Sequence, residues 1–115
     1  MRTAIWAVMA LALFGHQSAA AATSDQVARG KNLSFQLCAS CHQIDPAQKR
    51  PLRVYSAKTH SDVAALTFKE IAQRNGRDPH FLEQTLDEPH YPMLRRSLSN
   101  ADKQDIIAYI KSLGS

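Results

Sequence analysis

A chain of 115 residues, of which 44% are hydrophobic and 21% charged, is long enough for one domain and too short for two. This composition excludes a disordered chain, and two cysteines are too few for a scaffold built on disulfides. The formal net charge of +4 is mild and excludes a nucleic-acid-binding arm, so we expect no nucleic-acid partner.

The first 22 residues are typical of a secretory signal peptide. Arg2 supplies a positive charge, eleven apolar residues follow over 4–14, and small residues at 19–22 offer a cleavage site. An apolar run of that length is too short to span a bilayer, so a signal is favoured over a membrane anchor. We therefore predict a signal peptide over 1–22 and an exported domain over 23–115, with a net charge of +3 and no stable membrane span.

The mature segment begins with a predicted helix, followed by a loop. Thr23 or Ser24 can cap a helix that runs from residue 25 to about residue 37. Gly30 inside that helix costs about 1 kcal/mol relative to alanine, so we expect a packing reason for it. Residues 43–66 are polar, show no hydrophobic period and contain two prolines, which predicts a loop without strands.

Two short helices are predicted after this loop. Thr67 and Glu70 form a capping-box pattern at the start of a helix that reaches about residue 74. Asp78 followed by Pro79 starts another helix, which reaches about residue 86.

The C-terminal helix has the clearest pattern. Ser99 precedes it as a cap, Asp102 follows three residues later, and Gly114 stands where a left-handed cap would end it. Its apolar stripe consists of Ile106, Ile107, Ile110 and Leu113. With three to four helices and no convincing strand, the sequence predicts an all-α single domain.

The segment Cys38-Ala39-Ser40-Cys41-His42 carries the strongest functional signal. Two thiols three positions apart lie on one face of a helical turn, where both can reach the two vinyl groups of one haem. The imidazole directly after them can then bind the haem iron. The motif therefore predicts one haem c, attached covalently through thioethers to Cys38 and Cys41, with His42 as an iron ligand.

Three other interpretations of this motif are weaker. A thioredoxin-type site expects a βαβ unit, which the sequence does not show. A disulfide between the two cysteines leaves His42 without a role. A zinc site needs four ligands with a second pair at metal spacing, whereas His60, His80 and His90 are scattered.

At these residues the chain resembles a small class I c-type cytochrome of bacteria, over essentially the whole mature segment. Gly30 lies eight positions before the first haem cysteine, as in that family, where it lets the first helix cross the last one closely. Tyr109 falls at the family's aromatic contact position in the last helix. The resemblance implies the cytochrome c fold, with three to four helices around one covalently bound haem.

The chain also departs from the family pattern. Ser34 stands where the family often has an aromatic residue, four positions before the first cysteine. In the family a proline carbonyl often steadies the haem histidine, and Pro46 and Pro51 are both candidates here. Residues 23–115 contain no tryptophan, so hydrogen bonds to the haem propionates must come from other donors. The candidate donors are Arg53, Tyr55, Ser56 and Thr59.

The far side of the iron needs a methionine or histidine ligand, or else stays open. Met93 is the single methionine of the mature segment, and it lies between prolines and the last helix, where packing alone explains it poorly. His90, three residues earlier, is the competing ligand. The resemblance places the family's ligand methionine at this point, shortly before a Leu-Ser helix start. We therefore predict His42 and Met93 as the axial ligands.

Together these residues predict a monohaem electron carrier with no enzymatic activity, a periplasmic monomer that passes single electrons between redox protein partners. The alternatives are a haem enzyme or gas sensor with an open distal site, and the haem subunit of a periplasmic dehydrogenase. Cations near the haem-bearing segments predict a docking surface for a partner with an acidic surface. They are Lys31, Lys49, Arg50, Arg53, Arg95 and Arg96.

Overall fold

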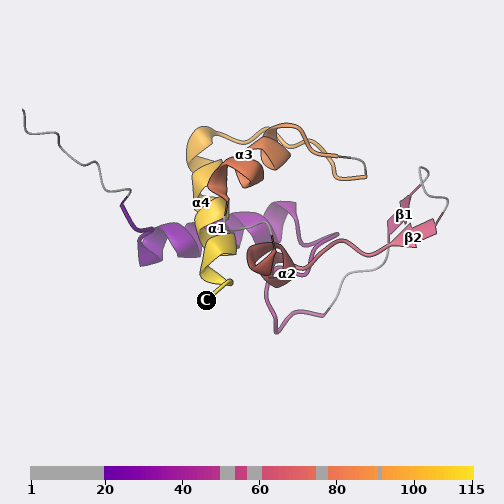
Figure 1. Cartoon of the computed structure of the whole chain (residues 1–115), viewed down its shortest axis with the longest axis horizontal. Helices are drawn as coiled ribbons and strands as arrows, with labels where there is room; N and C mark the ends of the chain where they lie inside the picture. Colours follow the sequence, from indigo (N-terminus) through magenta and orange to yellow (C-terminus); the bar gives the residue numbers. More distant parts are fainter. Residues whose placement is uncertain (1–19, 50–53, 57–60, 75–77, 91) are drawn as a thin grey trace, which may run out of the picture.

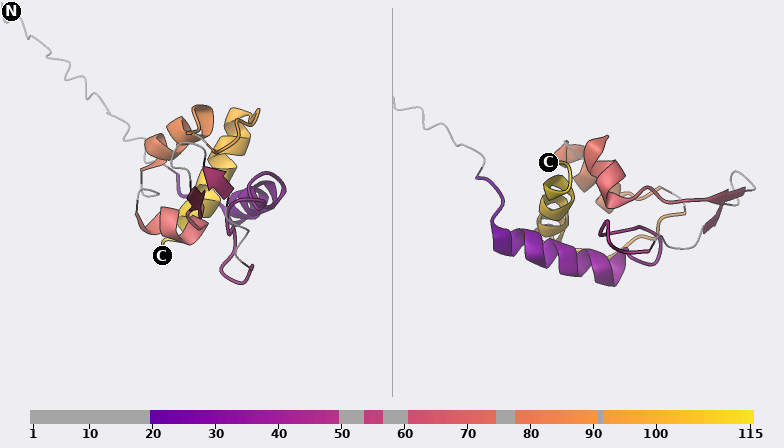
Figure 2. Two further views of the ribbon diagram at one scale, coloured as in Figure 1. Left: turned by 90° about the vertical axis from the view of Figure 1, so that its right-hand side faces the viewer. Right: turned by 90° about the horizontal axis from the view of Figure 1, so that it is seen from below.

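The computed structural model describes residues 20–49, 54–56, 61–74, 78–90 and 92–115. Within them the elements, in chain order, are α1 (Ser24–Leu37), β1 (Val54–Ser56), β2 (Ser61–Val63), α2 (Phe68–Gln73), α3 (Pro79–Asp87) and α4 (Asn100–Ser112). Figures 1 and 2 show α4 running across α1, and both α2 and α3 pack against α4. The predicted helical fold class is confirmed.

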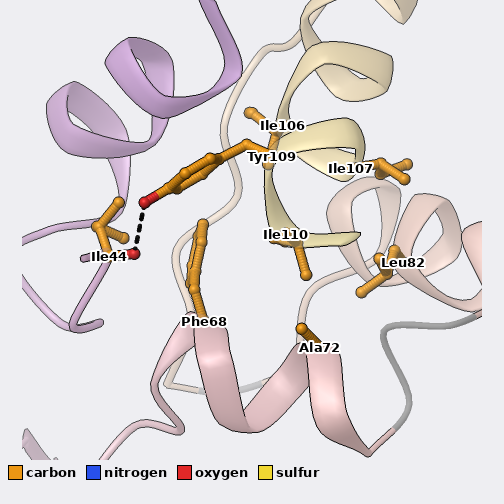
Figure 3. Close-up of a cluster of buried hydrophobic side chains, with 8 residues drawn as sticks. All are labelled: Ile44, Phe68, Ala72, Leu82, Ile106, Ile107, Tyr109 and Ile110. Carbon is orange, nitrogen blue, oxygen red and sulfur yellow. Dashed lines mark hydrogen bonds between the residues drawn. The ribbon is translucent and has the colours of Figure 1, made fainter. Parts of the chain in front are cut away.

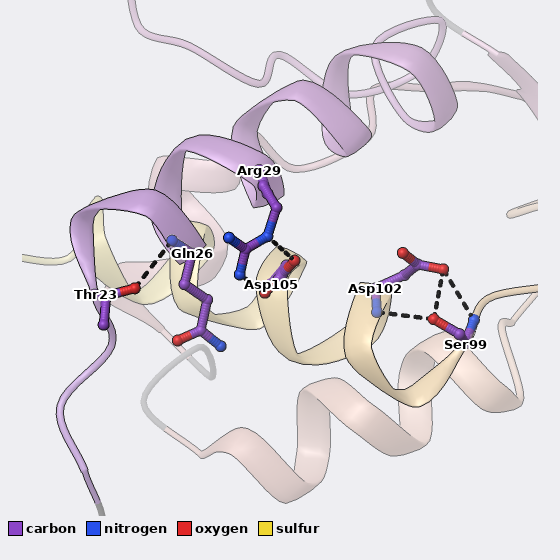
Figure 4. A network of polar contacts seen from close by, with 6 residues as sticks. All are labelled: Thr23, Gln26, Arg29, Ser99, Asp102 and Asp105. Atoms are coloured by element: carbon purple, nitrogen blue, oxygen red, sulfur yellow. Dashed lines mark hydrogen bonds and ion pairs between the residues drawn. The ribbon is translucent and has the colours of Figure 1, made fainter.

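Each helix begins at a predicted cap. The Thr23 hydroxyl caps α1 and accepts a hydrogen bond from the backbone N–H of Gln26 at 3.2 Å (Figure 4). Thr67 and Ser99 form complete capping boxes at the starts of α2 and α4, and Asp78 caps α3. These contacts span two or three residues and satisfy N–H groups that the first helical turn leaves free, so local sequence is sufficient to predict them.

Gly30 lies where α1 and α4 cross. A Cβ atom added at Gly30 would lie 1.8 Å from the carbonyl oxygen of Asp105 and 3.0 Å from the Cβ of Tyr109. Beside this point, Nε of Arg29 donates to the Asp105 carboxylate at 2.9 Å (Figure 4). Ser34 is fully buried one turn later, and its hydroxyl donates to the Gly30 carbonyl at 2.7 Å. The expected packing reason for Gly30 is thus confirmed, and a small hydroxyl fills the place of the family's aromatic residue.

The hydrophobic core lies between α4 and the elements packed around it (Figure 3). Leu113, the last residue of the predicted α4 stripe, is partly buried against this core. The fully or nearly fully buried members are Ile44, Phe68, Ala72, Leu82, Ile106, Ile107, Tyr109 and Ile110. The core therefore joins the three C-terminal helices to the segment that directly follows the Cys-His motif.

The segment predicted to be a loop contains a short antiparallel hairpin. β1 pairs with β2, with Tyr55 opposite Asp62. Neither strand contacts a described helix, and Figure 1 shows the hairpin projecting beyond the helices. The prediction of no strand was wrong, because strands of three residues are too short to produce a hydrophobic period.

The end of α4 also differs from the prediction. Gly114 does not adopt the left-handed conformation. Instead, the N–H groups of Leu113 and Gly114 bond to carbonyl oxygens three residues back, at 3.0 and 3.1 Å, which tightens the last turn. A Cβ atom at Gly114 would lie 3.2 Å from the carbonyl oxygen of Ala72, so the small residue here serves the packing of α4 against α2.

The predicted signal peptide falls mostly on residues 1–19, which lie outside the described residues. Residues 20–22 are exposed and lead into α1. Of the helices that the structure describes, none is long and apolar enough to cross a membrane.

Candidate haem-binding site

The cysteines and the histidine of the motif lie together at the end of α1. Cys38 caps the helix, and its N–H donates to the carbonyl oxygen of Ser34 at 2.9 Å. The Cys38 carbonyl in turn accepts from the N–H groups of Cys41 at 3.1 Å and His42 at 2.9 Å. The chain therefore makes one more turn after α1, the local structure on which the prediction of a shared face for the two cysteines depends. Both thiols are free, so the disulfide considered from the sequence is not formed.

The thiol of Cys38 is largely enclosed by the protein. Burial raises its pKa to about 11; the positive charge of Arg96 opposes that rise, and Cys41 adds to it. Arg96, three residues after Met93, therefore acts on the Cys38 thiol through its charge.

His42 is oriented by a backbone carbonyl. Its Nδ1 lies 2.7 Å from the carbonyl oxygen of Leu66. A carbonyl can only accept, so Nδ1 carries the proton and Nε2 keeps its lone pair for a metal. The expectation for Pro46 was wrong, because Leu66 supplies the carbonyl and the Pro46 carbonyl accepts from the side-chain amide of Gln43 at 3.4 Å. The other candidate, Pro51, lies outside the described residues.

Phe68 is a second contact of His42 that the sequence did not single out. The two ring centroids are 5.6 Å apart and the rings are tilted by 60°. Both Leu66 and Phe68 adjoin Thr67, the cap of α2, so the capping of α2 places both contacts. A capping box was visible in the sequence, but every residue has a carbonyl, so nothing marked Leu66 as the acceptor.

Met93 lies in the irregular segment between α3 and α4. It is half-buried, and its N–H donates to the carbonyl oxygen of His90 at 2.9 Å. His90 itself is exposed, as is His80 in α3. Among the described residues, no group of three or more histidine, cysteine, aspartate or glutamate side chains is placed to hold a metal ion, so the zinc interpretation finds no ligand set there.

The predicted docking cations differ in how they are bound. Lys31 pairs with Asp45, and Arg95 donates to the carbonyl oxygen of Asp87 at 3.0 Å. Lys49 is exposed, and Arg96 forms no ion pair with any described residue. The remaining cations, Arg50 and Arg53, lie outside the described residues, as does the candidate propionate donor Thr59. The other propionate candidates, Tyr55 and Ser56, belong to β1, where the structure describes the backbone alone.

The donor set fits a covalently bound haem. Two free thiols stand one helical turn apart, and directly after them comes an imidazole whose Nδ1 is already satisfied. This arrangement provides two sulfur atoms for thioethers and one nitrogen for the iron. Cys38, Cys41 and His42 would hold the group.

Comparison with known proteins gives one match. The family model described as Cytochrome c matches residues 27–114, from the first half of α1 to the residue before the C-terminus. The matched range contains both cysteines, His42 and Met93. No curated protein and no solved structure gives a significant match.

Proposed function

Because the chain belongs to the cytochrome c family, we propose that it is a periplasmic electron carrier whose single haem is ligated by His42 and Met93. As a member of this family it binds haem c covalently through Cys38 and Cys41 and acts in haem-based electron transfer. The observation that carries the proposed ligation is the 2.7 Å contact between Nδ1 of His42 and the Leu66 carbonyl, since it leaves Nε2 for the iron.

Met93 is proposed as the second ligand because of its surroundings. It is half-buried while the competing ligand His90 is exposed, and its segment continues to Arg96, whose charge acts on Cys38. A thioether sulfur stabilises ferrous iron, so this ligand would raise the reduction potential.

The haem supplies the redox chemistry, the reversible uptake of one electron by its iron. The protein residues hold and orient the group: Leu66 fixes the tautomer of His42, and Phe68 packs against the imidazole. If His42 and Met93 both bound the iron, they would leave no position for a substrate, which favours a carrier over an enzyme or a gas sensor.

Export and docking complete the proposal. Export is supported by the signal pattern of residues 1–22. Docking to a partner with an acidic surface is supported by Arg96, which pairs with no acidic group among the described residues and whose charge acts on the haem-attachment residue Cys38. Lys31 contributes less because Asp45 already balances its charge.

The far-red absorption of the ferric holoprotein tests the ligation. Methionine sulfur on ferric haem iron gives a weak charge-transfer band there, which a bis-histidine haem lacks. We expect the band in the wild-type protein, its loss in Met93→Ala, and its retention in the matched control His90→Ala.

The opposite pattern, with loss in His90→Ala alone, would assign the ligand to His90. Fast and complete binding of carbon monoxide to the reduced wild-type protein at neutral pH would instead indicate an open distal site. Co-purification with a larger partner would indicate a dehydrogenase subunit. Haem that is removed by acid–acetone extraction would contradict covalent attachment.

A further inference from the structure

The segment 43–48, directly after His42, is anchored to α4 by one hydrogen bond. The hydroxyl of Tyr109 donates to the carbonyl oxygen of Ile44 at 2.9 Å (Figure 3). Ile44 is fully buried and Tyr109 is 3% exposed, so water does not compete for this contact. Tyr109 therefore fixes the backbone two residues beyond His42.

A second path from α4 to His42 runs through Phe68. Its ring lies 6.3 Å from the ring of Tyr109 and 5.6 Å from the ring of His42, measured between centroids. Its backbone N–H donates to the carbonyl oxygen of Gln43 at 3.0 Å. Phe68 thus contacts both the imidazole and the residue directly after it.

A third contact joins the same segment to α1. Lys31 forms an ion pair with Asp45, the residue next to Ile44. Burial raises the pKa of the Tyr109 hydroxyl, while the charge of Lys31 lowers it and that of Asp45 raises it, so the hydroxyl stays protonated as a donor at neutral pH. The segment is therefore held from α1, α2 and α4 at once.

We propose that the Tyr109 hydroxyl is a positioning group for His42: by holding the Ile44 carbonyl, it sets the plane of the imidazole at the haem iron. The inference rests on the proposed function, in which His42 is an axial ligand. The bond to Leu66 holds the ring at Nδ1, and the plane of the ring depends also on the position of the backbone to which the side chain is attached. The anchored backbone after His42, together with the Phe68 ring, supplies a second constraint on that plane.

The variant Tyr109→Phe tests this proposal in the ferric holoprotein, because it removes the hydroxyl and keeps both the Cβ atom next to Gly30 and the ring next to Phe68. The plane of an axial imidazole determines the electron paramagnetic resonance g values of low-spin ferric haem and the order of the haem-methyl proton shifts. We expect both to change. Hydrogen exchange at the Phe68 amide should become about tenfold faster, as for the loss of one buried hydrogen bond.

Two further variants separate positioning from stability. Arg29→Gln breaks the ion pair with Asp105 at the same crossing without touching residues 43–48, so it should lower stability and leave the haem signals unchanged. Lys31→Gln removes the partner of Asp45 and should shift the haem signals in the same direction as Tyr109→Phe, by less.

Wild-type g values and methyl shifts in both Tyr109→Phe and Lys31→Gln would overturn the inference. A wild-type holoprotein without the low-spin, six-coordinate signal would overturn the proposed function instead, before any substitution is made. The two failures are therefore distinguishable.

Discussion

The crossing of α1 and α4 and the segments that carry the haem ligands are held in different ways. At the crossing, a Cβ atom on Gly30 would lie 1.8 Å from the carbonyl oxygen of Asp105, so the two helices are in close contact along their backbones. The segments with His42 and Met93 are irregular, and a small number of specific contacts hold them at particular atoms, as the Leu66 carbonyl holds the imidazole. Close packing of α1 against α4 holds the helices together, and a few specific contacts place the predicted haem ligands relative to them.

Substitutions in these two regions should therefore affect different measured properties. A substitution at the crossing should act on the free energy of unfolding, because packed helices cannot adjust without moving apart. A substitution in the ligand segments should act on the haem spectrum or on electron transfer and cost less stability. Tyr109 belongs to both regions, since it packs at Gly30 and holds Ile44.

Breaking the crossing should give the largest effect. In Gly30→Ala the new methyl group meets backbone atoms of Asp105, which cannot swing away as a side chain could. We expect the free energy of unfolding to fall by about 3 kcal/mol or more, at or above the upper end of the usual cost of overpacking. The gain of about 1 kcal/mol in helix propensity offsets this only in part. Denaturant unfolding of the holoprotein measures this change in the free energy of unfolding.

Gly114→Ala is the matched control for that substitution. Its Cβ atom would lie 3.2 Å from the Ala72 carbonyl oxygen and 3.4 Å from the Ala72 Cβ, distances that a small shift of the chain end can relieve. We expect a change below about 1 kcal/mol. Equal losses in the two variants would contradict the close approach at Gly30.

A smaller loss is expected where α3 meets α4, next to the Met93 segment. Nζ of Lys103 donates to the Asp87 carboxylate at 2.8 Å, and the Lys103 side chain is only 9% exposed. Asp87→Ala leaves this cation without its partner, so we expect a loss of about 2 kcal/mol in denaturant unfolding. Lys103→Met removes the charge and keeps an apolar side chain, and should cost less. A larger cost for Lys103→Met would show that the ion pair is net stabilising.

The smallest expected effect is on the rate of electron transfer to a docked partner, without a change in the packing of the helices. Arg96→Gln removes a cation that has no ion-pair partner in the described part of the chain and whose charge acts on Cys38. Electron transfer to an acidic redox partner at low ionic strength should therefore slow by about two- to threefold. The difference from wild type should shrink at physiological salt, where screening acts over about 8 Å. Second-order rates with the native partner across a salt series measure this. The matched control Arg95→Gln should change the rate less, because the charge of Arg96 acts on the Cys38 thiol and no such effect of Arg95 is found. Rates that do not depend on salt would contradict electrostatic docking.

The four helices were predictable because the sequence patterns that indicate them are local. The caps Thr23, Thr67, Asp78 and Ser99 act within three residues, and the α4 stripe repeats with the helical period. The hairpin was missed because each strand has three residues and packs against no described helix. Its sequence therefore lacks the alternation of apolar and polar residues that a buried face produces.

The sequence by itself determined the chemistry of the site: two thiols and an imidazole at a spacing that one helical turn converts into a single face. Only the tertiary structure decided what orients that imidazole. The acceptor of His42 is a backbone carbonyl at Leu66, and the anchor behind it is the hydroxyl of Tyr109 on α4. Every residue carries a carbonyl, so the residue types in the sequence do not indicate which carbonyl accepts the hydrogen bond from His42. The choice is made when α4 packs across α1 and brings the distant segments together.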